Sequence, residues 1–155
     1  MTPGIQEAKK YKISYSIHEY SHDESSESYG LEAADKMGVS QNVVFKTLVL
    51  TLDNKELVVG IIPVSSKLSL KLIAKALGAK KAAMADKLTV ERSTGYILGG
   101  VSPIGQKKRL KTIIDSSVNN YSTIYVSAGR RGLEIELSPV DLTKLTNGKI
   151  ADICQ

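Results

Sequence analysis

The sequence predicts an α/β (α+β) fold, in which a mixed, barrel-like sheet is surrounded by helices within a single domain. Two observations support this prediction. Short apolar segments with the two-residue alternation of strands interleave irregularly with segments of helical periodicity, and many of the strands are neighbours joined by turns. The 155 residues contain no internal repeat and no low-complexity linker, so residues 1–155 are expected to form one domain.

The first half of the chain is expected to contain two short helices and three strands. Thr2 and Pro3 are typical of the N-cap and the first residue of a helix, and Gly38 is typical of the residue after a helix end. An acidic polar segment, residues 18–28, precedes the second helix and is a candidate lid. In order, the elements are a helix at 2–11, a strand at 12–20, a helix at 29–38, and strands at 43–52 and 57–64.

The second half of the chain opens with a predicted amphipathic helix at 65–78. Its apolar stripe runs from Leu70 to Leu77. Three lysines form one basic line along its opposite side: Lys67, Lys71 and Lys75. The remaining elements are one or two short helices within 80–94, a glycine-broken strand at 96–105, a strand at 111–118, a hairpin at 122–137 that turns at 128–131, and a helix that starts with Ser138 and Pro139.

The chain is moderately basic, with a formal net charge of +5 and a sequence pI near 9.2. This excess is compatible with a polyanionic partner but does not require one. Basic residues cluster at 67–81, 107–111 and 130–131. Each cluster therefore has two open interpretations, a nucleic-acid contact or a solvated surface.

Sequence features related to location favour the cytoplasm. The first residues lack the apolar segment of ~7–15 residues that a signal peptide contains, and no run approaches the ~18 apolar residues of a membrane span. The single cysteine, Cys154, has no partner in the chain, which suits a reducing compartment. We therefore expect a cytoplasmic protein without a membrane partner.

Lys46 is the residue that the predicted strand at 43–52 does not explain. The two-residue period places it with Val44 and Leu48 on the more aliphatic face, which a strand normally turns toward a core. An ammonium group there must extend to water, find a partner, or serve a function. The pattern alone leaves these three possibilities open.

The residues do not support the common catalytic motifs. The sequence around Ser102 misses the G-x-S-x-G nucleophile motif by one residue, and Pro103 lacks the N–H that this motif uses as an oxyanion donor. A metal site would have to rest on His18 and His22, the only histidines. The glycine-rich motifs that bind nucleotide phosphates are also absent. We therefore expect neither a metal nor a cofactor.

Several motifs, in their order and spacing, resemble those of the YbaK-type aminoacyl-tRNA deacylases. These motifs are VVFKTLV, KLIAKALGAKK, MADKLTVERSTGYILGGVSPIGQKKRLKTIID and TIYVSAGRRGLEIEL. The resemblance extends over almost the whole chain, and the mixed β-barrel with helices that it implies agrees with the fold expected above. It implies an enzyme that clears mischarged tRNA, typically cysteine attached to proline tRNA. The same superfamily includes the editing domain inserted in bacterial prolyl-tRNA synthetases.

The resemblance also assigns roles to particular residues. It makes Lys46 the essential catalytic lysine, and Gly99 and Gly100 the loop that contacts the aminoacyl end of the substrate. Tyr29 falls where relatives often carry phenylalanine, and Glu134 where close relatives carry aspartate. The substrate-binding residues expected on this basis are Tyr20, Tyr29, Thr47, Gly99, Gly100 and Glu134.

The chemistry of the family implies that the cysteine thiol of the substrate attacks its own carbonyl and leaves as a cyclic thioester. The enzyme then needs to supply positioning rather than a nucleophile of its own. Two alternatives stay open: editing of another mischarged tRNA such as Ala-tRNA(Pro), or a non-catalytic module that binds tRNA or a synthetase.

The partners implied by the resemblance are the acceptor end of an aminoacylated tRNA and, as a docking partner, prolyl-tRNA synthetase. Basic side chains would then follow the phosphate backbone of the acceptor stem. The residues expected to do so are Lys71, Lys75, Lys107, Lys108, Arg109 and Arg130, with Lys67, Lys80, Lys81 and Arg131 in the same clusters.

Overall fold

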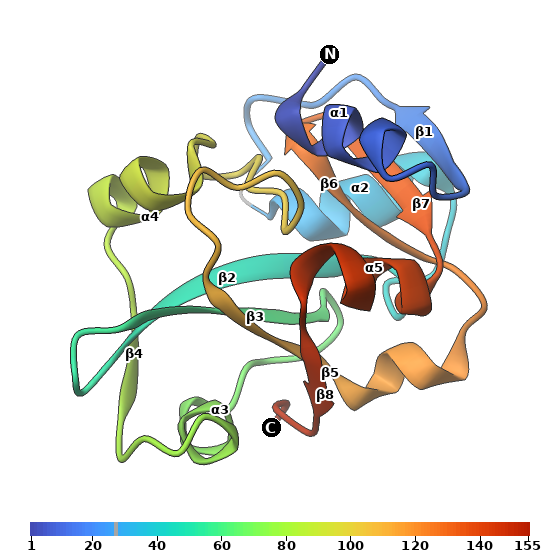
Figure 1. The fold of residues 1–155 in the computed structure, drawn as a ribbon. Helices are drawn as coiled ribbons and strands as arrows, with labels where there is room; N and C mark the ends of the chain where they lie inside the picture. Colours follow the sequence, from blue (N-terminus) through green and yellow to red (C-terminus); the bar gives the residue numbers. More distant parts are fainter. Residues whose placement is uncertain (27) are drawn as a thin grey trace.

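The computed structural model describes residues 1–26 and 28–155, and its elements are arranged around two sheets (Figure 1). Residue 27, which belongs to the acidic segment 18–28, lies outside the described residues. The helices are α1 (Pro3–Lys10), α2 (Tyr29–Met37), α3 (Leu70–Ala76), α4 (Lys87–Thr94), α5 (Pro139–Thr146) and the 3-10 helix η1 (Ser116–Asn120). The strands are β1 (Tyr15–Glu19), β2 (Phe45–Leu52), β3 (Leu57–Pro63), β4 (Ala82–Met84), β5 (Lys111–Asp115), β6 (Ile124–Arg130), β7 (Leu133–Leu137) and β8 (Lys149–Ala151).

One sheet is antiparallel and the other is mixed, and the two sheets meet at the start of β2. The first is a three-stranded antiparallel sheet in the order β1-β7-β6. The second has five strands in the order β4-β2-β3-β5-β8, with β5 parallel to both β3 and β8. A parallel bridge between Val44 and Tyr125 connects the residue before β2 to β6. The arrangement is mixed and barrel-like, as predicted, without forming a closed barrel in the described part of the chain.

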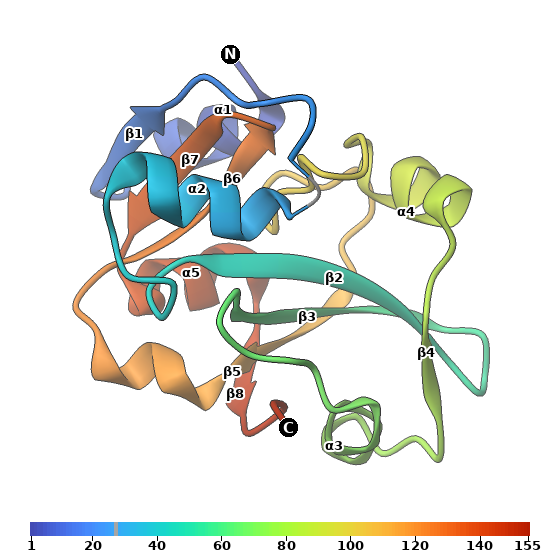
Figure 2. The ribbon, with the colours of Figure 1, turned by 180° about the vertical axis from the view of Figure 1, so that it is seen from behind.

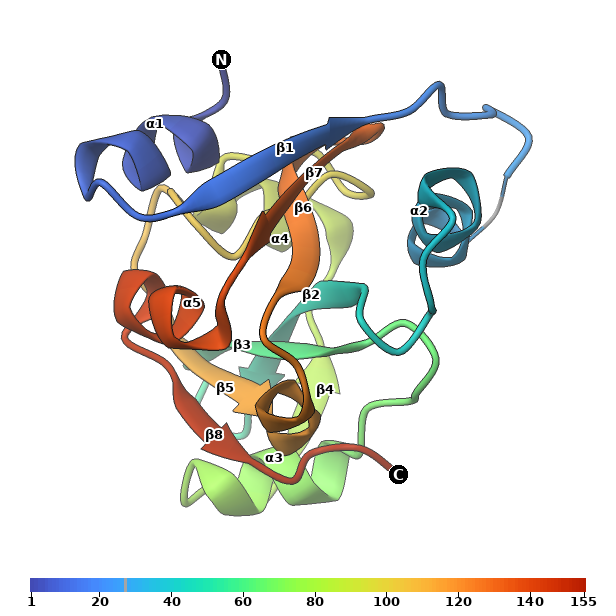
Figure 3. The same ribbon diagram turned by 90° about the vertical axis from the view of Figure 1, so that its right-hand side faces the viewer.

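The main core fills the space between the two sheets. Phe45 and Ile61 from the five-stranded sheet and Val126 and Ile135 from the three-stranded sheet are almost fully buried in one cluster. Burial of a large apolar side chain contributes about 1.5–3 kcal/mol, so this cluster is a major source of stability. Figure 3 shows α1 and α2 on opposite sides of the three-stranded sheet, and Ala8 of α1 belongs to the main core.

A second core lies on the other face of the five-stranded sheet, beneath α3. Leu50 and Ile62 of the sheet pack there with Ile73 of α3 and with Ile153 near the C-terminus. A third, smaller cluster joins Ala33 of α2 to the start of β2 and to the outer face of the three-stranded sheet. The five-stranded sheet is thus buried on both faces, which explains why its strands read as nearly continuous apolar runs.

Local sequence signals place several helix ends as predicted. The Ile5 N–H donates to Thr2 Oγ1 at 3.3 Å, and the Asp141 N–H donates to Ser138 Oγ at 3.1 Å, so the predicted N-caps of α1 and α5 are confirmed. Gly38 ends α2 with a φ of 68°, the left-handed conformation that glycine adopts readily. The strands predicted at 43–52 and 57–64 are confirmed as β2 and β3.

The strand predicted at 96–105 is wrong, because this segment is an irregular loop. Two of its hydrogen bonds close within the segment: the Tyr96 hydroxyl donates to the Ile104 carbonyl at 2.6 Å, and the Gly100 N–H donates to the Ile97 carbonyl at 2.9 Å. Val101 and Ile104 are nevertheless buried in the main core. The apolar pattern of the segment therefore reflects a loop packed on the core and not the period of a strand.

The first turn of the helix predicted at 65–78 is also wrong. Helix α3 starts only at Leu70, because Ser69 caps it. Residues 65–69 instead run beside the C-terminal residues, and the Ser69 N–H donates to the Ile153 carbonyl at 2.7 Å. A contact between distant parts of the chain has replaced the local helical preference there.

This later start changes the surface predicted for the helix. Lys67 lies outside α3, so the predicted basic line along the helix contains only Lys71 and Lys75. Leu70, predicted on the apolar stripe, is 40% exposed at the first helical position. The buried face of α3 is accordingly narrower than the periodicity indicates.

Three further element boundaries differ from the prediction. Residues 82–84 form strand β4, which pairs with β2, and the helix predicted there begins only after the cap residue Asp86. The strand predicted at 111–118 ends at Asp115, whose carboxylate accepts the Ser117 N–H and starts η1. The predicted turn at 128–131 lies two residues later, because β6 contains a bulge and extends to Arg130.

We expect Gly132→Ala to destabilise the fold strongly. Gly132 has a φ of 90°, and a Cβ there would lie 2.7 Å from the Tyr20 carbonyl oxygen. Backbone strain and a clash with main chain together are expected to lower the free energy of unfolding by about 3 kcal/mol in urea denaturation.

Gly38→Ala is the matched control. Its φ is 68°, but open space surrounds the added Cβ, so only the strain remains, about 1 kcal/mol. Equal losses for the two variants would contradict a role for the contact with Tyr20.

Candidate functional site

A cavity of about 300 Å³ opens between α2, the start of β2 and the outer face of β6 and β7. Figure 2 shows α2 lying over this face of the sheet and above the start of β2. The Val44–Tyr125 bridge joins β2 to β6, and beyond it the two strands separate into different sheets. Lys46 and Ser127, each two residues past the bridge, line the opening from the two diverging strands.

Most of the predicted catalytic and substrate-binding residues come together in this cavity. Those that line it are Lys46, Tyr20, Tyr29, Thr47, Gly99 and Glu134. Gly100 is not among the lining residues: it is buried, and a Cβ there would lie 2.8 Å from the Arg130 Cα. Its lack of a side chain lets the loop approach the β6–β7 turn. The roles of all these residues remain predictions.

The backbone N–H groups of Gly99 and Gly100 differ in their surroundings. The Gly100 N–H donates to the Ile97 carbonyl and is not available to a ligand. The Gly99 N–H has no acceptor within the described part of the chain. Of the two glycine N–H groups, only that of Gly99 is therefore available to a ligand.

Lys46 and Thr47 bring polar groups without internal partners to the cavity wall. Lys46 is half-buried, and its ammonium group forms no hydrogen bond or ion pair with the residues that the structure describes. The Thr47 hydroxyl is buried and, among the same residues, has no hydrogen-bond partner. Because such groups are normally paired, both are suited to contact a polar ligand.

Glu134 is the buried acid of the site. Its side chain lies in β7 opposite Ser127 of β6 and is only 6% exposed. Burial raises the pKa of Glu134 to about 8, so its carboxyl group is mostly protonated at neutral pH. Burial, and next the nearby Glu134, raise the pKa of Tyr20 to about 12. The inner end of the cavity is thus lined by neutral hydrogen-bonding groups.

Tyr29 forms the wall on the side of α2. The guanidinium carbon of Arg131 lies 4.1 Å from the centroid of the Tyr29 ring. The ring also packs closely against Gly99. Sequence analysis placed Arg131 among the residues that contact RNA, whereas its side chain is only 18% exposed and lines the cavity. Arg131 lies in the turn that follows β6, where no strand alternation indicates the direction of a side chain, so the sequence offered no signal for this position.

Other cavity residues have no distinctive sequence signal, because they are small or apolar. They are Ser28, Gly30, Ala33, Val44, Phe45, Leu48, Leu98, Val101 and Ser127. Gly30 is an example: a Cβ there would lie 2.2 Å from Val64 Cγ1, so only glycine lets α2 sit this close to the end of β3.

The basic residues predicted to contact tRNA are not gathered around the cavity. Lys71 and Lys75 lie on α3, which covers the face of the five-stranded sheet away from the three-stranded sheet. Arg109 donates to the Leu145 carbonyl at 3.2 Å, and Arg130 lies 3.8 Å from Glu19 in an exposed pair. The remaining two, Lys107 and Lys108, are exposed in the loop after α4.

Other features of the described residues bear on the excluded chemistries. His18 Nε2 lies 2.9 Å from Glu136 Oε1, outside the cavity. Burial raises the pKa of the Cys154 thiol to about 11, which keeps it protonated and weakly nucleophilic. No three metal-binding side chains cluster among the described residues, and none of their helices is long and apolar enough to cross a membrane.

Comparison with known proteins identifies one sequence family. The model of the aminoacyl-tRNA editing domain family matches residues 25–145. EbsC of Enterococcus faecalis, named as a candidate Cys-tRNA(Pro)/Cys-tRNA(Cys) deacylase, is 40% identical over 155 residues, which cover 98% of this chain and 92% of EbsC. YwhH of Bacillus subtilis is 26% identical over 125 residues, which cover 80% of this chain and 79% of YwhH.

Solved structures share the fold at lower sequence identity. The crystal structure of a candidate trans-editing enzyme for prolyl-tRNA synthetase matches with a TM-score of 0.84 at 20% identity, covering 100% of this chain and 99% of that one. The crystal structure of the protein APE2540 matches with a TM-score of 0.88 at 23% identity, covering 99% and 100% of the two chains. Both likenesses show that the fold is common to all three chains.

We expect the stability of the protein to depend on pH through Glu134. Its pKa is raised from 4.5 to about 8 in the folded chain, so the folded chain keeps a proton that the unfolded chain releases. The free energy of unfolding should therefore fall as the pH rises from 4.5 through about 8, by on the order of 5 kcal/mol.

Glu134→Gln should remove most of this fall, because its amide does not ionise. Urea unfolding at several pH values measures the effect, and Glu24→Gln, a change at an exposed position, is the control. An unchanged slope in Glu134→Gln would rule out Glu134 as the source of the pH dependence.

Proposed function

Because the chain belongs to the aminoacyl-tRNA editing domain family, we propose that it is a trans-editing deacylase that removes cysteine from mischarged Cys-tRNA(Pro). The observation that carries the proposal is Lys46, which lines the cavity from a mostly apolar strand and has no partner among the residues that the structure describes. An aminoacyl ester presents a carbonyl oxygen and a ribose phosphate, and an ammonium group can stabilise negative charge on either. The 40% identical relative supports the choice of cysteine as the amino acid.

The chemistry that fits these residues uses the thiol of the substrate. Its sulfur attacks the carbonyl carbon of the same cysteinyl group, a C–S bond forms, and the ester bond to the ribose oxygen breaks. The thiol proton ends on the ribose oxygen, and the products are free tRNA and a small cyclic thioester. Effective molarities of ~10⁵ M or more are available to well-oriented intramolecular attack, so positioning can supply most of the rate.

The chain's own residues then have distinct roles in the proposal. The Lys46 ammonium stabilises the oxyanion that develops on the carbonyl, and the Gly99 N–H donates to the same oxygen. The Thr47 hydroxyl and the largely protonated Glu134 supply hydrogen bonds to the polar atoms of the aminoacyl group. Ser127 has Glu134 and not a histidine as its cross-strand neighbour, which is consistent with a nucleophile supplied by the substrate.

Two alternative functions are compatible with the same fold: editing of another mischarged tRNA, and binding of tRNA or a synthetase without catalysis. A cavity of about 300 Å³ accepts alanine as well as cysteine, so its volume does not choose between Cys-tRNA(Pro) and Ala-tRNA(Pro). A non-catalytic tRNA- or synthetase-binding module is the remaining alternative, and glutamate in place of the aspartate of close relatives at position 134 is what favours it. We retain the deacylase, because Lys46 and Tyr20, two residues that the family resemblance assigns to the site, are both present and line one cavity.

The partners proposed for this activity follow from the substrate. The acceptor end of the aminoacylated tRNA enters the cavity, and Lys107 and Lys108 contact its phosphate backbone. Prolyl-tRNA synthetase is the docking partner that would hand over the mischarged tRNA. We place the enzyme in the cytoplasm, where this tRNA is charged and used.

We expect the wild-type protein to release cysteine from Cys-tRNA(Pro) and to leave Ser-tRNA(Pro) and Ala-tRNA(Pro) largely intact. Serine has nearly the size of cysteine but lacks the thiol, so this comparison separates nucleophilicity from fit. Release of labelled amino acid measures the rates. Equal clearance of alanine and cysteine would instead require an enzyme-positioned water and would contradict the thiol mechanism.

In the same assay, Lys46→Ala is expected to lower the rate on Cys-tRNA(Pro) by about 100-fold or more, because it removes the charge that stabilises the oxyanion. Lys144→Ala, at an exposed position on α5, is the matched control and should retain the wild-type rate. A folded Lys46→Ala protein with full activity would remove Lys46 from the mechanism.

We expect the double charge reversal of Lys107 and Lys108 to glutamate to weaken tRNA binding about tenfold or more at low salt. It should also reduce the slope of log affinity against log salt by about 1–2, because two phosphate contacts are lost. Reversal of Lys9 and Lys10 on α1 changes the net charge equally and is the control. Equal effects of the two reversals would assign Lys107 and Lys108 to the general charge of the protein.

A further inference from the structure

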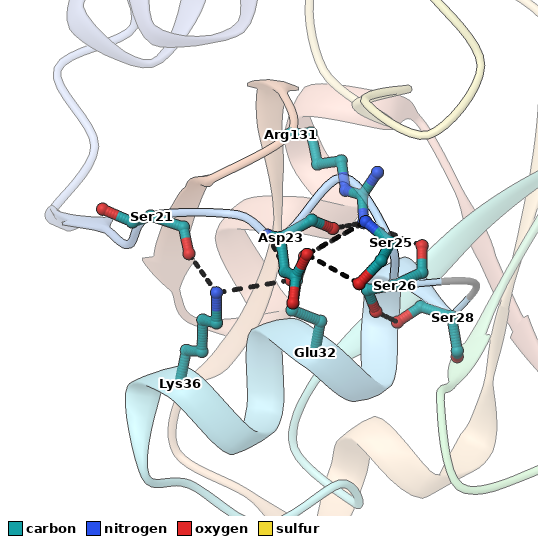
Figure 4. A network of polar contacts seen from close by, with 8 residues as sticks. All are labelled: Ser21, Asp23, Ser25, Ser26, Ser28, Glu32, Lys36 and Arg131. Atoms are coloured by element: carbon teal, nitrogen blue, oxygen red, sulfur yellow. Dashed lines mark hydrogen bonds and ion pairs between the residues drawn. The ribbon is translucent and has the colours of Figure 1, made fainter.

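Arg131, which lines the cavity, belongs to a network of polar contacts with residues of the segment after β1 and of α2 (Figure 4). Its Nη2 donates to the Asp23 carbonyl at 2.9 Å, to the Ser26 carbonyl at 3.0 Å and to Glu32 Oε1 at 3.2 Å. These acceptors come from the segment after β1 and from α2, whereas Arg131 follows β6. One guanidinium group therefore ties three distant parts of the chain together.

Glu32 fixes the same network from the side of α2. Its side chain is only 3% exposed, and it also accepts the Asp23 N–H at 2.6 Å and lies 3.4 Å from Lys36. Burial opposes the ionisation of Glu32, but the bonds from Asp23, Arg131 and Lys36 together hold its pKa below its usual value. Arg131 and Glu32 thus form an ion pair inside the protein, and Arg131 is not a free cation for RNA, although its buried Nε has no hydrogen-bond partner among the described residues.

The network ends on Tyr29. The guanidinium carbon of Arg131 lies 4.1 Å from the centroid of the Tyr29 ring, a distance at which the cation attracts the π face. The ring also contacts Gly99, where a Cβ would lie 2.8 Å from Tyr29 Cε2. Tyr29 is 41% exposed at the cavity mouth, and yet two fixed groups hold its ring.

We propose that Arg131 is a positioning residue, which holds the Tyr29 ring as a rigid wall of the cavity so that the aminoacyl group is bound in its reactive orientation. This inference rests on the proposed function and adds a residue outside the predicted site. Intramolecular attack is sensitive to small misplacements of the reacting atoms. Loss of the Arg131 contact therefore lowers kcat more than it raises KM.

The first test measures the order of the ring without any assay of activity. The chain contains no tryptophan, so Tyr29→Trp introduces one tryptophan at the wall, whose fluorescence can be excited apart from that of the remaining tyrosines. Time-resolved anisotropy of this protein should show little fast local motion, and adding Arg131→Gln should at least double the amplitude of that motion. Arg92→Gln, an exposed arginine on α4, is the matched control and should leave it unchanged. Equal amplitudes with and without Arg131 overturn the proposal.

The second test compares the kinetics of Arg131→Lys with those of the wild type on Cys-tRNA(Pro). Lysine retains a charge for Glu32 and so protects the fold, but it lacks the planar guanidinium group that lies over the Tyr29 ring. The expected result is a kcat about tenfold lower with KM changed less than about threefold. A mobile ring with an unchanged kcat overturns the positioning role.

The two tests also separate this inference from the proposed function. If wild-type protein releases no cysteine, the deacylase proposal fails, while the anisotropy of the Tyr29→Trp protein still decides whether Arg131 orders the ring. If Arg131→Gln does not fold, Arg131→Lys in the Tyr29→Trp background supplies the same comparison. An unchanged anisotropy in that folded variant then overturns the proposal.

Discussion

The parallel bridge between Val44 and Tyr125 is the constraint on which the rest of the structure depends. The Tyr125 N–H binds the Val43 carbonyl, and the Val64 N–H binds the Val44 carbonyl, so this point holds β6, the start of β2 and the end of β3 together. Had β2 and β6 continued to pair, they would have been neighbouring strands of one sheet, with no opening between them. Because the strands diverge, the main core fills one side of the junction and the cavity opens on the other.

Two of the ionisable side chains that line the cavity, Lys46 and Glu134, do not satisfy each other within the described part of the chain. A direct pair would have satisfied both groups internally and left little for a substrate to bind. Instead, burial favours the neutral form of Glu134, and the ammonium group remains available. The arrangement is costly for stability and useful for binding, as is common where a site requires polar groups inside an apolar shell.

Sequence signals were reliable where the structure is determined locally, and less so where distant contacts decide. Thr2, Ser138 and Gly38 mark helix ends through bonds within a few residues, and these ends were predicted. The loop at 96–105 and strand β4 depend on packing and pairing with other segments, which a single-residue pattern does not encode. The candidate site shows the same difference between what a local pattern indicates and what distant contacts decide. Lys46 stood out as a charge in an apolar strand and its neighbours followed from family resemblance, whereas Arg131 appeared to be one more basic surface residue.

The pairing of β1 with β7 has a consequence for the order in which the protein folds. Ile17 pairs with Ile135, so most of the chain lies between two adjacent strands of the three-stranded sheet. Closing so long a loop costs more conformational entropy than forming the neighbouring hairpins β2–β3 and β6–β7. Those hairpins are therefore the natural nuclei, and β1 joins late. Tyr20, which follows β1, reaches its place in the cavity only at that step. A partly folded chain would then already hold most of its apolar core before it had any capacity to bind a substrate.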